Sequence, residues 1–155
     1  MIELNNKTQQ DFLNREWVQR LLDAGVDMSD AKYCIYTDVR GDFIDLINKE
    51  WGPVFREEHK IVPTYTVSEL LYKLHEWIYP TFNGMEYSGG LHLTKDAPFY
   101  FAYYDLKNSV GKELTEEFWA EFEHPIESLA ALLIQCHTKD TGCRTPDAGD
   151  ISSKE

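Results

Sequence analysis

The stretch YCIYTDVRGDFIDL, residues 33–46, decides how the fold is interpreted, because it combines two runs of β-forming residues with a turn between them. The first run, residues 33–37, and the second, residues 43–47, are rich in aromatic and β-branched side chains that favour extended backbone. Asp and Gly lie between the two runs, where a chain can reverse tightly. The stretch therefore predicts a β-hairpin.

The turn of this hairpin contains Arg40-Gly41-Asp42, a tripeptide that extracellular proteins can present to receptors that bind metal through the carboxylate of their ligand. A receptor ligand would need export, and the N-terminal MIELNNKTQQDF lacks the apolar core of a secretory signal. Glycine at a hairpin reversal meets a requirement of the backbone, since it adopts positive φ without steric cost. We therefore interpret the tripeptide as the tip of a turn.

Helices are predicted on both sides of the hairpin. Residues 8–24 carry apolar side chains at helical spacing, and Gly25 suits the left-handed position after a helix. Thr66-Val67-Ser68-Glu69 has the pattern of a capping box, and the apolar residues after it predict a second helix that Pro80 ends. Pro125 suits the first turn of a third helix, whose apolar surface is so wide that it must be largely covered.

Two further strands are predicted at residues 91–93 and 99–104. We interpret Ser88-Gly89-Gly90 before them as a loop rather than as a backbone site for an anion. Residues 113–123 are ambiguous, because their glutamates recur at helical spacing whereas their large apolar residues alternate as in a strand.

The predicted fold is α+β, an antiparallel sheet of four to five strands with helices packed on one face, in the order α-β-β-α-β-β-(β)-α. A chain of 155 residues can bury a core as one domain, and we assign residues 1–137 to that domain. Residues 138–155 contain Gly, Pro, Asp and Ser with almost no large apolar side chains, which predicts a flexible polar C-terminal tail.

The composition narrows the classes of partner. The chain has 27 acidic and 15 basic residues, and its formal net charge of −12 repels phosphate backbones, which disfavours nonspecific nucleic-acid binding. The same charge favours a partner with a basic surface. No apolar run is long enough to span a bilayer, and three cysteines without paired spacing suit a reducing compartment. We therefore expect a cytoplasmic protein that does not enter a membrane.

No local motif for catalysis or cofactor binding occurs, since GxxxxGK[ST], GxGxxG and GxSxG are all missing. Asp38, Asp42 and Asp45 form the densest run of carboxylates near a turn, but their spacing differs from that of a calcium loop. The histidines lack the spacing of zinc ligands, and the adjacent Cys136 and His137 would point about 100° apart on a helix. The sequence thus predicts no metal or cofactor site and leaves any catalytic residues unknown.

The segment KELTEEFWAEFEHPIE, residues 112–127, is the most suggestive feature, because it places aromatic side chains among carboxylates. Such a surface can engage a basic groove, either on another protein or as a mimic of nucleic-acid charge. The other interpretation is that the aromatic residues face the core and the glutamates face water. The candidate protein-binding residues are Glu113, Glu117, Phe118, Trp119, Glu121 and Phe122.

Three segments together resemble a known group of proteins: YCIYTDVRGDFIDL, VPTYTVSELLYKLHEWI and PIESLAALLIQC. They are similar to small uncharacterised proteins encoded in phages, prophages and other mobile elements of gut Bacteroides-type bacteria. In that group a helix, a hairpin, a P-x-[FY]-[ST]-x-x-x-L helix, further strands and a final amphipathic helix recur. The resemblance implies a fold and a genomic habitat, and it carries over no catalytic residue. The polar tail after residue 137 departs from the pattern.

Two functional hypotheses follow. The first is a small acidic accessory or adaptor protein of a mobile element, non-enzymatic, which works by binding another protein. The second is a small hydrolase or nuclease-like enzyme whose site is assembled from distant Asp and His residues. A concave pocket with converging titratable groups would favour the enzyme, whereas an exposed aromatic patch would favour the binding protein.

Overall fold

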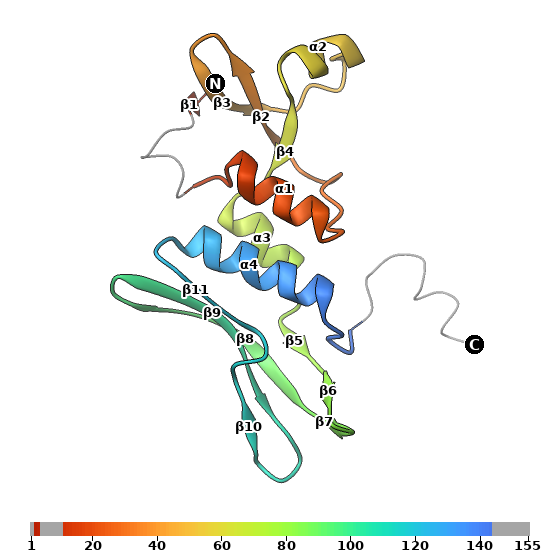
Figure 1. Ribbon diagram of the computed structural model, residues 1–155, viewed down its shortest axis with the longest axis vertical. Helices are drawn as coiled ribbons and strands as arrows, with labels where there is room; N and C mark the ends of the chain where they lie inside the picture. The colour runs from red at the N-terminus through yellow and green to blue at the C-terminus, as the bar shows by residue number, and fades with distance from the viewer. Residues whose placement is uncertain (1, 4–10, 144–155) are drawn as a thin grey trace, which may run out of the picture.

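The computed structural model describes residues 2–3 and 11–143. Among these residues, two larger antiparallel sheets lie at opposite ends of the molecule, and three helices cross the space between them (Figure 1). The predicted α+β class is confirmed. The prediction of a single sheet is wrong, because the strands form sheet A in the first part of the chain, sheet B in the later part, and a separate two-stranded hairpin.

Sheet A contains the predicted hairpin. Its order is β1-β3-β2-β4, formed by β1 (Ile2–Glu3), β2 (Tyr33–Asp38), β3 (Gly41–Leu46) and β4 (Val62–Thr64). The chain reverses at Val39 and Arg40, and Gly41 has a φ of +127°, a conformation that glycine adopts without strain. The predicted reversal is therefore confirmed, with Arg40 in the turn and Gly41 and Asp42 as the first residues of β3. A short helix, α2 (Pro53–Glu58), lies between β3 and β4 in the chain and buries none of its side chains.

The first helix, α1 (Arg15–Asp23), is shorter than the predicted range 8–24, part of which lies outside the described residues. The helix begins after Asn14, whose side-chain oxygen accepts a hydrogen bond of 3.0 Å from the Trp17 N–H and so caps the helix. Gly25 follows the helix with a φ of +89°, as predicted.

The second helix, α3 (Val67–Lys73), begins at the predicted capping box. The Thr66 hydroxyl accepts from the Glu69 N–H (3.3 Å), and the Glu69 carboxylate accepts from the Thr66 N–H (3.0 Å). The predicted continuation of this helix toward the next proline is wrong. The chain becomes extended at Leu74, and β5 (Trp77–Ile78) pairs with a strand of sheet B.

Sheet B has the order β10-β9-β8-β5, and β11 also pairs with β9. Its strands are β5, β8 (Ser88–Asp96), β9 (Phe99–Lys107), β10 (Glu113–Leu114) and β11 (Trp119–Phe122). A short hairpin of β6 (Thr81–Phe82) and β7 (Met85–Glu86) lies between β5 and β8 in the chain. The strands predicted at residues 91–93 and 99–104 are confirmed, and the ambiguous segment 113–123 contributes two strands.

Ser88-Gly89-Gly90, which was expected to form a loop, belongs to β8. A Cβ at Gly89 would lie 1.9 Å from the carbonyl oxygen of Asp105 on β9, so the close approach of the two strands requires glycine here. The glycines that suggested a loop thus mark a backbone contact inside the sheet.

The third helix, α4 (Pro125–Thr138), packs against α1, α3 and sheet B (Figure 1). Its buried residues occupy much of its surface, as the wide apolar pattern predicted: Ile126, Ser128, Leu129, Ala130, Leu132 and Leu133. The Ser128 hydroxyl accepts from the Phe122 N–H (3.1 Å) and donates to the Tyr100 carbonyl (2.7 Å). The helix therefore inserts a hydroxyl group between β11 and β9, where these two residues face each other.

Residues 139–143 follow α4 and lie beside the strand β5. The Tyr79 N–H donates to the carbonyl of Thr141 (2.8 Å), whose side chain is buried. Gly142 has a φ of +71°, and a Cβ there would lie 2.0 Å from the Tyr79 carbonyl oxygen. This part of the predicted tail is therefore packed on the domain, whereas residues 144–155 lie outside the described residues.

Candidate functional site

The strands of sheet B alternate between a side that faces α4 and a side that no described element covers. On β9, Ala102, Tyr104 and Leu106 are buried on the helix side, whereas Phe101 and Tyr103 point the other way and are partly exposed. We call this uncovered side the open face. In Figure 1 it is the side of sheet B that points away from the three helices.

Four rings cross the open face in contact with one another. His92 of β8 stacks on Tyr103 of β9, with centroids 5.2 Å apart and planes at 13°. Trp119 of β11 lies 5.1 Å from Tyr103 and 5.2 Å from Phe101. Strand register explains this contact, because Tyr103 is directly opposite both His92 and Trp119 on its two neighbouring strands. We call these four residues the aromatic row.

A groove of about 960 Å³ lies at the β5 side of the open face. Trp77 of β5 and Tyr79, the residue just after β5, both line it, whereas Ile78 between them is fully buried. Trp77 is 50% exposed and Tyr79 57% exposed. The Trp77 ring lies against the neighbouring strand, since a Cβ at Gly90 would be 3.2 Å from two of its ring carbons. The groove therefore presents two large exposed rings on a base of strand backbone.

Carboxylates predominate among the charged groups around the open face. Glu86 and Asp105 line the groove, and the exposed Glu121 is directly opposite a residue of the aromatic row. Lys107 also lines the groove, but its ammonium group lies 3.5 Å from the carboxylate of Glu113 on β10. The local charge thus has the same sign as the charge of the whole chain.

The structure places some of the predicted protein-binding residues at this face. Trp119 belongs to the aromatic row, and Glu121, two residues later in the same strand, is on the same side of the sheet. Glu113 borders the face through its contact with Lys107. These three residues therefore come together on one surface.

The other predicted residues lie behind the sheet. Phe118 is fully buried, and the half-buried Phe122 meets the ring of Trp17 edge to face at 5.2 Å. The Glu117 carboxylate lies 3.8 Å from the ammonium group of Lys139, which also donates to the Glu117 carbonyl. These side chains hold β11 against α1 and the end of α4, and they do not belong to the open face.

Sequence reasoning missed Trp77, Tyr79 and His92. The apolar spacing after the capping box extended the predicted helix through Trp77, so its ring was not considered as part of a surface. The signal available in the sequence is Trp77-Ile78-Tyr79, three consecutive residues of the aromatic and β-branched types that favour strands. His92 carried no comparable signal, because its contact with the row depends on strand register.

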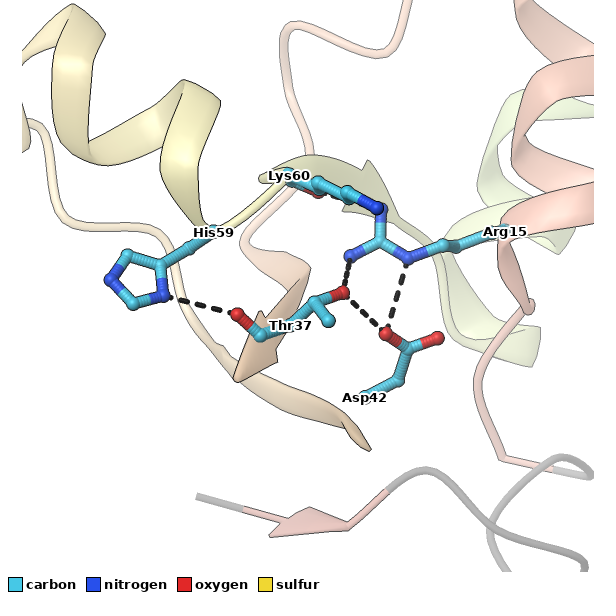
Figure 2. A network of polar contacts seen from close by, with 5 residues as sticks. All are labelled: Arg15, Thr37, Asp42, His59 and Lys60. Atoms are coloured by element: carbon cyan, nitrogen blue, oxygen red, sulfur yellow. Dashed lines mark hydrogen bonds and ion pairs between the residues drawn. The ribbon is translucent and has the colours of Figure 1, made fainter. Parts of the chain in front are cut away.

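A second polar cluster ties α1 to the hairpin of sheet A (Figure 2). The Arg15 guanidinium donates to the Asp42 carboxylate (3.3 Å), the Thr37 hydroxyl (2.5 Å) and the Lys60 carbonyl (2.6 Å). The Thr37 hydroxyl donates to the same Asp42 oxygen (2.5 Å), and its carbonyl lies 3.0 Å from Nδ1 of His59. The cluster satisfies its own polar groups, so we assign it a structural role.

The carboxylates that were considered for a metal ion do not converge. Asp38 forms an ion pair of 2.6 Å with Arg40, whose hydrogen bonds lower the pKa of this carboxyl group. Asp42 belongs to the cluster around Arg15, and Asp45 accepts from the N–H of the next residue (2.8 Å). Within the described ranges, no three His, Cys, Asp or Glu side chains lie in positions that could hold a metal ion.

Two of the cysteines have raised pKa values. Burial raises the pKa of the Cys34 thiol to about 11 and that of the Cys136 thiol to about 12. Both thiols are therefore protonated at neutral pH and are weak nucleophiles. Burial also lowers the pKa of the neighbouring His137.

Comparison of this chain with protein-family models, curated proteins and solved structures gives no match. Each helix within the described part of the chain is too short or too polar to cross a lipid bilayer. The function is therefore inferred from the chemistry and geometry of the open face.

Proposed function

We propose that this protein is a non-enzymatic accessory or adaptor protein that binds a basic surface of another protein through the open face of sheet B. The observation that carries the proposal is the aromatic row on a sheet face that no described element covers. Large exposed aromatic surfaces mark interaction sites, and Trp and Tyr are enriched among the residues that dominate binding energy.

The charges around the row support a basic partner. Glu86, Asp105 and Glu121 surround the open face, and the chain carries a formal net charge of −12. Opposite charge on a partner raises the rate of encounter and favours one orientation of binding, while like charge excludes other proteins and nucleic acids. A mobile-element habitat, which the resemblance implies, suits a small adaptor that acts on a host protein.

Charge reversal at the open face tests this proposal. The full chain, its Glu121→Lys variant and a matched Glu58→Lys variant are used to purify partners from the native host. Glu58→Lys changes the net charge by the same amount as Glu121→Lys. It does so away from the open face, because Glu58 is exposed at the end of α2 in the other half of the molecule. A basic protein should be retained by the wild type and by Glu58→Lys and lost with Glu121→Lys, at unchanged thermal stability.

The captured protein is then purified, and its affinity for each variant is measured by calorimetry. Equal affinity for Glu121→Lys and the wild type would remove the open face from consideration. Equal loss with both reversed variants would show that only net charge matters.

The second hypothesis, a hydrolase or nuclease-like enzyme, has one observation in its favour: His92 and Asp105 both line the groove. They come from neighbouring strands, but His92 stacks on Tyr103 and no hydrogen bond joins it to Asp105 among the described residues. A screen for ester and phosphodiester hydrolysis with the wild type and Asp105→Asn decides this hypothesis. Hydrolysis by the wild type that is lost in Asp105→Asn would establish the protein as an enzyme.

A further inference from the structure

Trp77 and Tyr79 have ring surfaces that the rest of the described chain leaves without a partner. Half or more of each side chain is exposed in the groove. No second aromatic ring and no cation of the described residues lies over either ring, although other rings of the protein have such neighbours.

Cations lie over five other rings of the described residues, and the two closest are guanidinium groups, whereas the three ammonium groups lie 5.3–5.9 Å from the ring centres. The guanidinium carbon of Arg20 lies 4.5 Å from the centre of the Trp17 ring, and that of Arg40 lies 4.6 Å from the centre of the Phe43 ring. A guanidinium group is planar and weakly hydrated, so it stacks on an aromatic face more readily than an ammonium group does. The exposed rings in the groove offer the same contact to a cation from outside.

The groove also supplies carboxylates for such a cation. Glu86 and Asp105 line it together with the two rings, and its lysine, Lys107, is already paired with Glu113. A guanidinium group that stacks on one ring can donate two parallel hydrogen bonds to a carboxylate at its edge. Rings and carboxylates in one groove therefore match the two chemical features of an arginine side chain.

We propose that the groove binds an extended, arginine-containing segment of the partner, with a guanidinium group on the exposed rings of Trp77 and Tyr79. This inference rests on the proposed function, and it names the partner's recognition element. A volume of about 960 Å³ exceeds the size of one side chain, so the groove has room for several residues of the segment. The aromatic row, which continues the same face, then contacts the residues beyond the arginine.

Matched peptides test the inference. Three peptides of about eight residues alternate serine with arginine, with lysine, or with citrulline, which has the shape of arginine without its charge. Calorimetry with the full chain should show the arginine peptide binding about tenfold more tightly than the lysine peptide, and no binding of the citrulline peptide. Equal affinity for arginine and lysine, or undiminished binding of citrulline, would overturn the inference.

Variants locate the contact. Trp77→Ala should weaken binding of the arginine peptide by about tenfold or more, whereas the matched Trp51→Ala should not, because Trp51 stacks on Phe55 in the other half of the molecule. Tyr79→Ala repeats the test in case Trp77→Ala fails to fold. Binding that neither groove variant reduces would exclude this groove. If a neutral hexasaccharide binds in the groove and the arginine peptide does not, the inference is wrong and the ligand of the groove is a carbohydrate.

The two proposals fail in different ways. If the natural partner depends on Glu121 but binds Trp77→Ala and Tyr79→Ala as tightly as the wild type, only the arginine inference is wrong. If the arginine peptide binds at Trp77 while partner binding ignores Glu121, the groove is real and the proposed docking face is wrong.

Discussion

The side-chain amide of Gln135 on α4 forms two hydrogen bonds with the backbone of Trp119 on β11. Its oxygen accepts from the Trp119 N–H (2.9 Å), and its nitrogen donates to the Trp119 carbonyl (2.6 Å). A helix side chain thus pairs with the outer side of a strand in the way that another strand would, and it covers part of an edge that could otherwise join a second molecule.

Gln135→Leu should lower the free energy of unfolding by about 1–2 kcal/mol, because both backbone groups lose their partner. Urea unfolding measures this change, and hydrogen exchange at the Trp119 amide should become faster. Gln19→Leu is the matched control, since the amide of the exposed Gln19 donates to the exposed Asp23, and its loss should change stability by less than about 0.5 kcal/mol. Equal stability of the two variants would contradict a role for the amide pair.

Ser128→Ala should destabilise the protein by about 1–3 kcal/mol, since it leaves the Phe122 N–H and the Tyr100 carbonyl without the hydroxyl that joins them. Ser128 is fully buried, so water does not easily replace it. Thermal unfolding gives the measurement, with the exposed Ser109→Ala as control. A change no larger than that of the control would show that the strand ends do not need the hydroxyl.

Arg15→Lys should lower stability by about 1–2 kcal/mol, because an ammonium group cannot donate from three nitrogens of a planar fork to Asp42, Thr37 and Lys60 together. Arg40→Lys changes the same chemistry at an exposed pair and should cost less than about 0.5 kcal/mol. Urea titrations of both variants provide the comparison. If the order of the two effects were reversed, the cluster in Figure 2 would not hold α1 to the hairpin.

Stability should fall as the pH rises from about 9 to about 11, in part because of Cys34. Burial raises the pKa of this thiol from 9.0 to about 11, so the unfolded chain loses the proton first and the folded state must bind it more tightly. The stabilising contribution of the protonated Cys34 thiol is complete below pH 9.0, and it is lost as the pH rises through the pKa of the folded state, about 11.

Urea midpoints at about pH 8 and about pH 10.5 measure this effect in the wild type and in Cys34→Ala. The loss of stability across the interval should be smaller in the variant, which has no thiol at this position. An identical loss in both proteins would assign the pH dependence to other groups.

The sequence predicted those elements whose signal lies in neighbouring residues. The hairpin of residues 33–46, the capping box at Thr66 and the helix that begins at Pro125 all formed as expected, because turn chemistry and helix caps act over a few residues. Segment 113–123 stayed undecided because its pattern fits both periods.

The division into two sheets and the open face could not be predicted in the same way. Trp77 and Ile78 became a strand because they pair with Gly90 and Gly89, which lie beyond an intervening hairpin. The aromatic row likewise depends on a register that aligns His92, Tyr103 and Trp119 across three strands. Such pairings are long-range choices that tertiary structure makes, and local propensity does not specify them.

The hydrogen bond between Tyr79 and Thr141 has a thermodynamic consequence. The strand that carries the exposed rings and the residues after α4 share backbone contacts, so whatever orders one of them must order the other. A ligand that fills the groove should therefore slow hydrogen exchange in residues 139–143, and stronger packing of those residues should tighten ligand binding. Exchange rates in residues 139–143 would then report ligand affinity without any label on the binding surface.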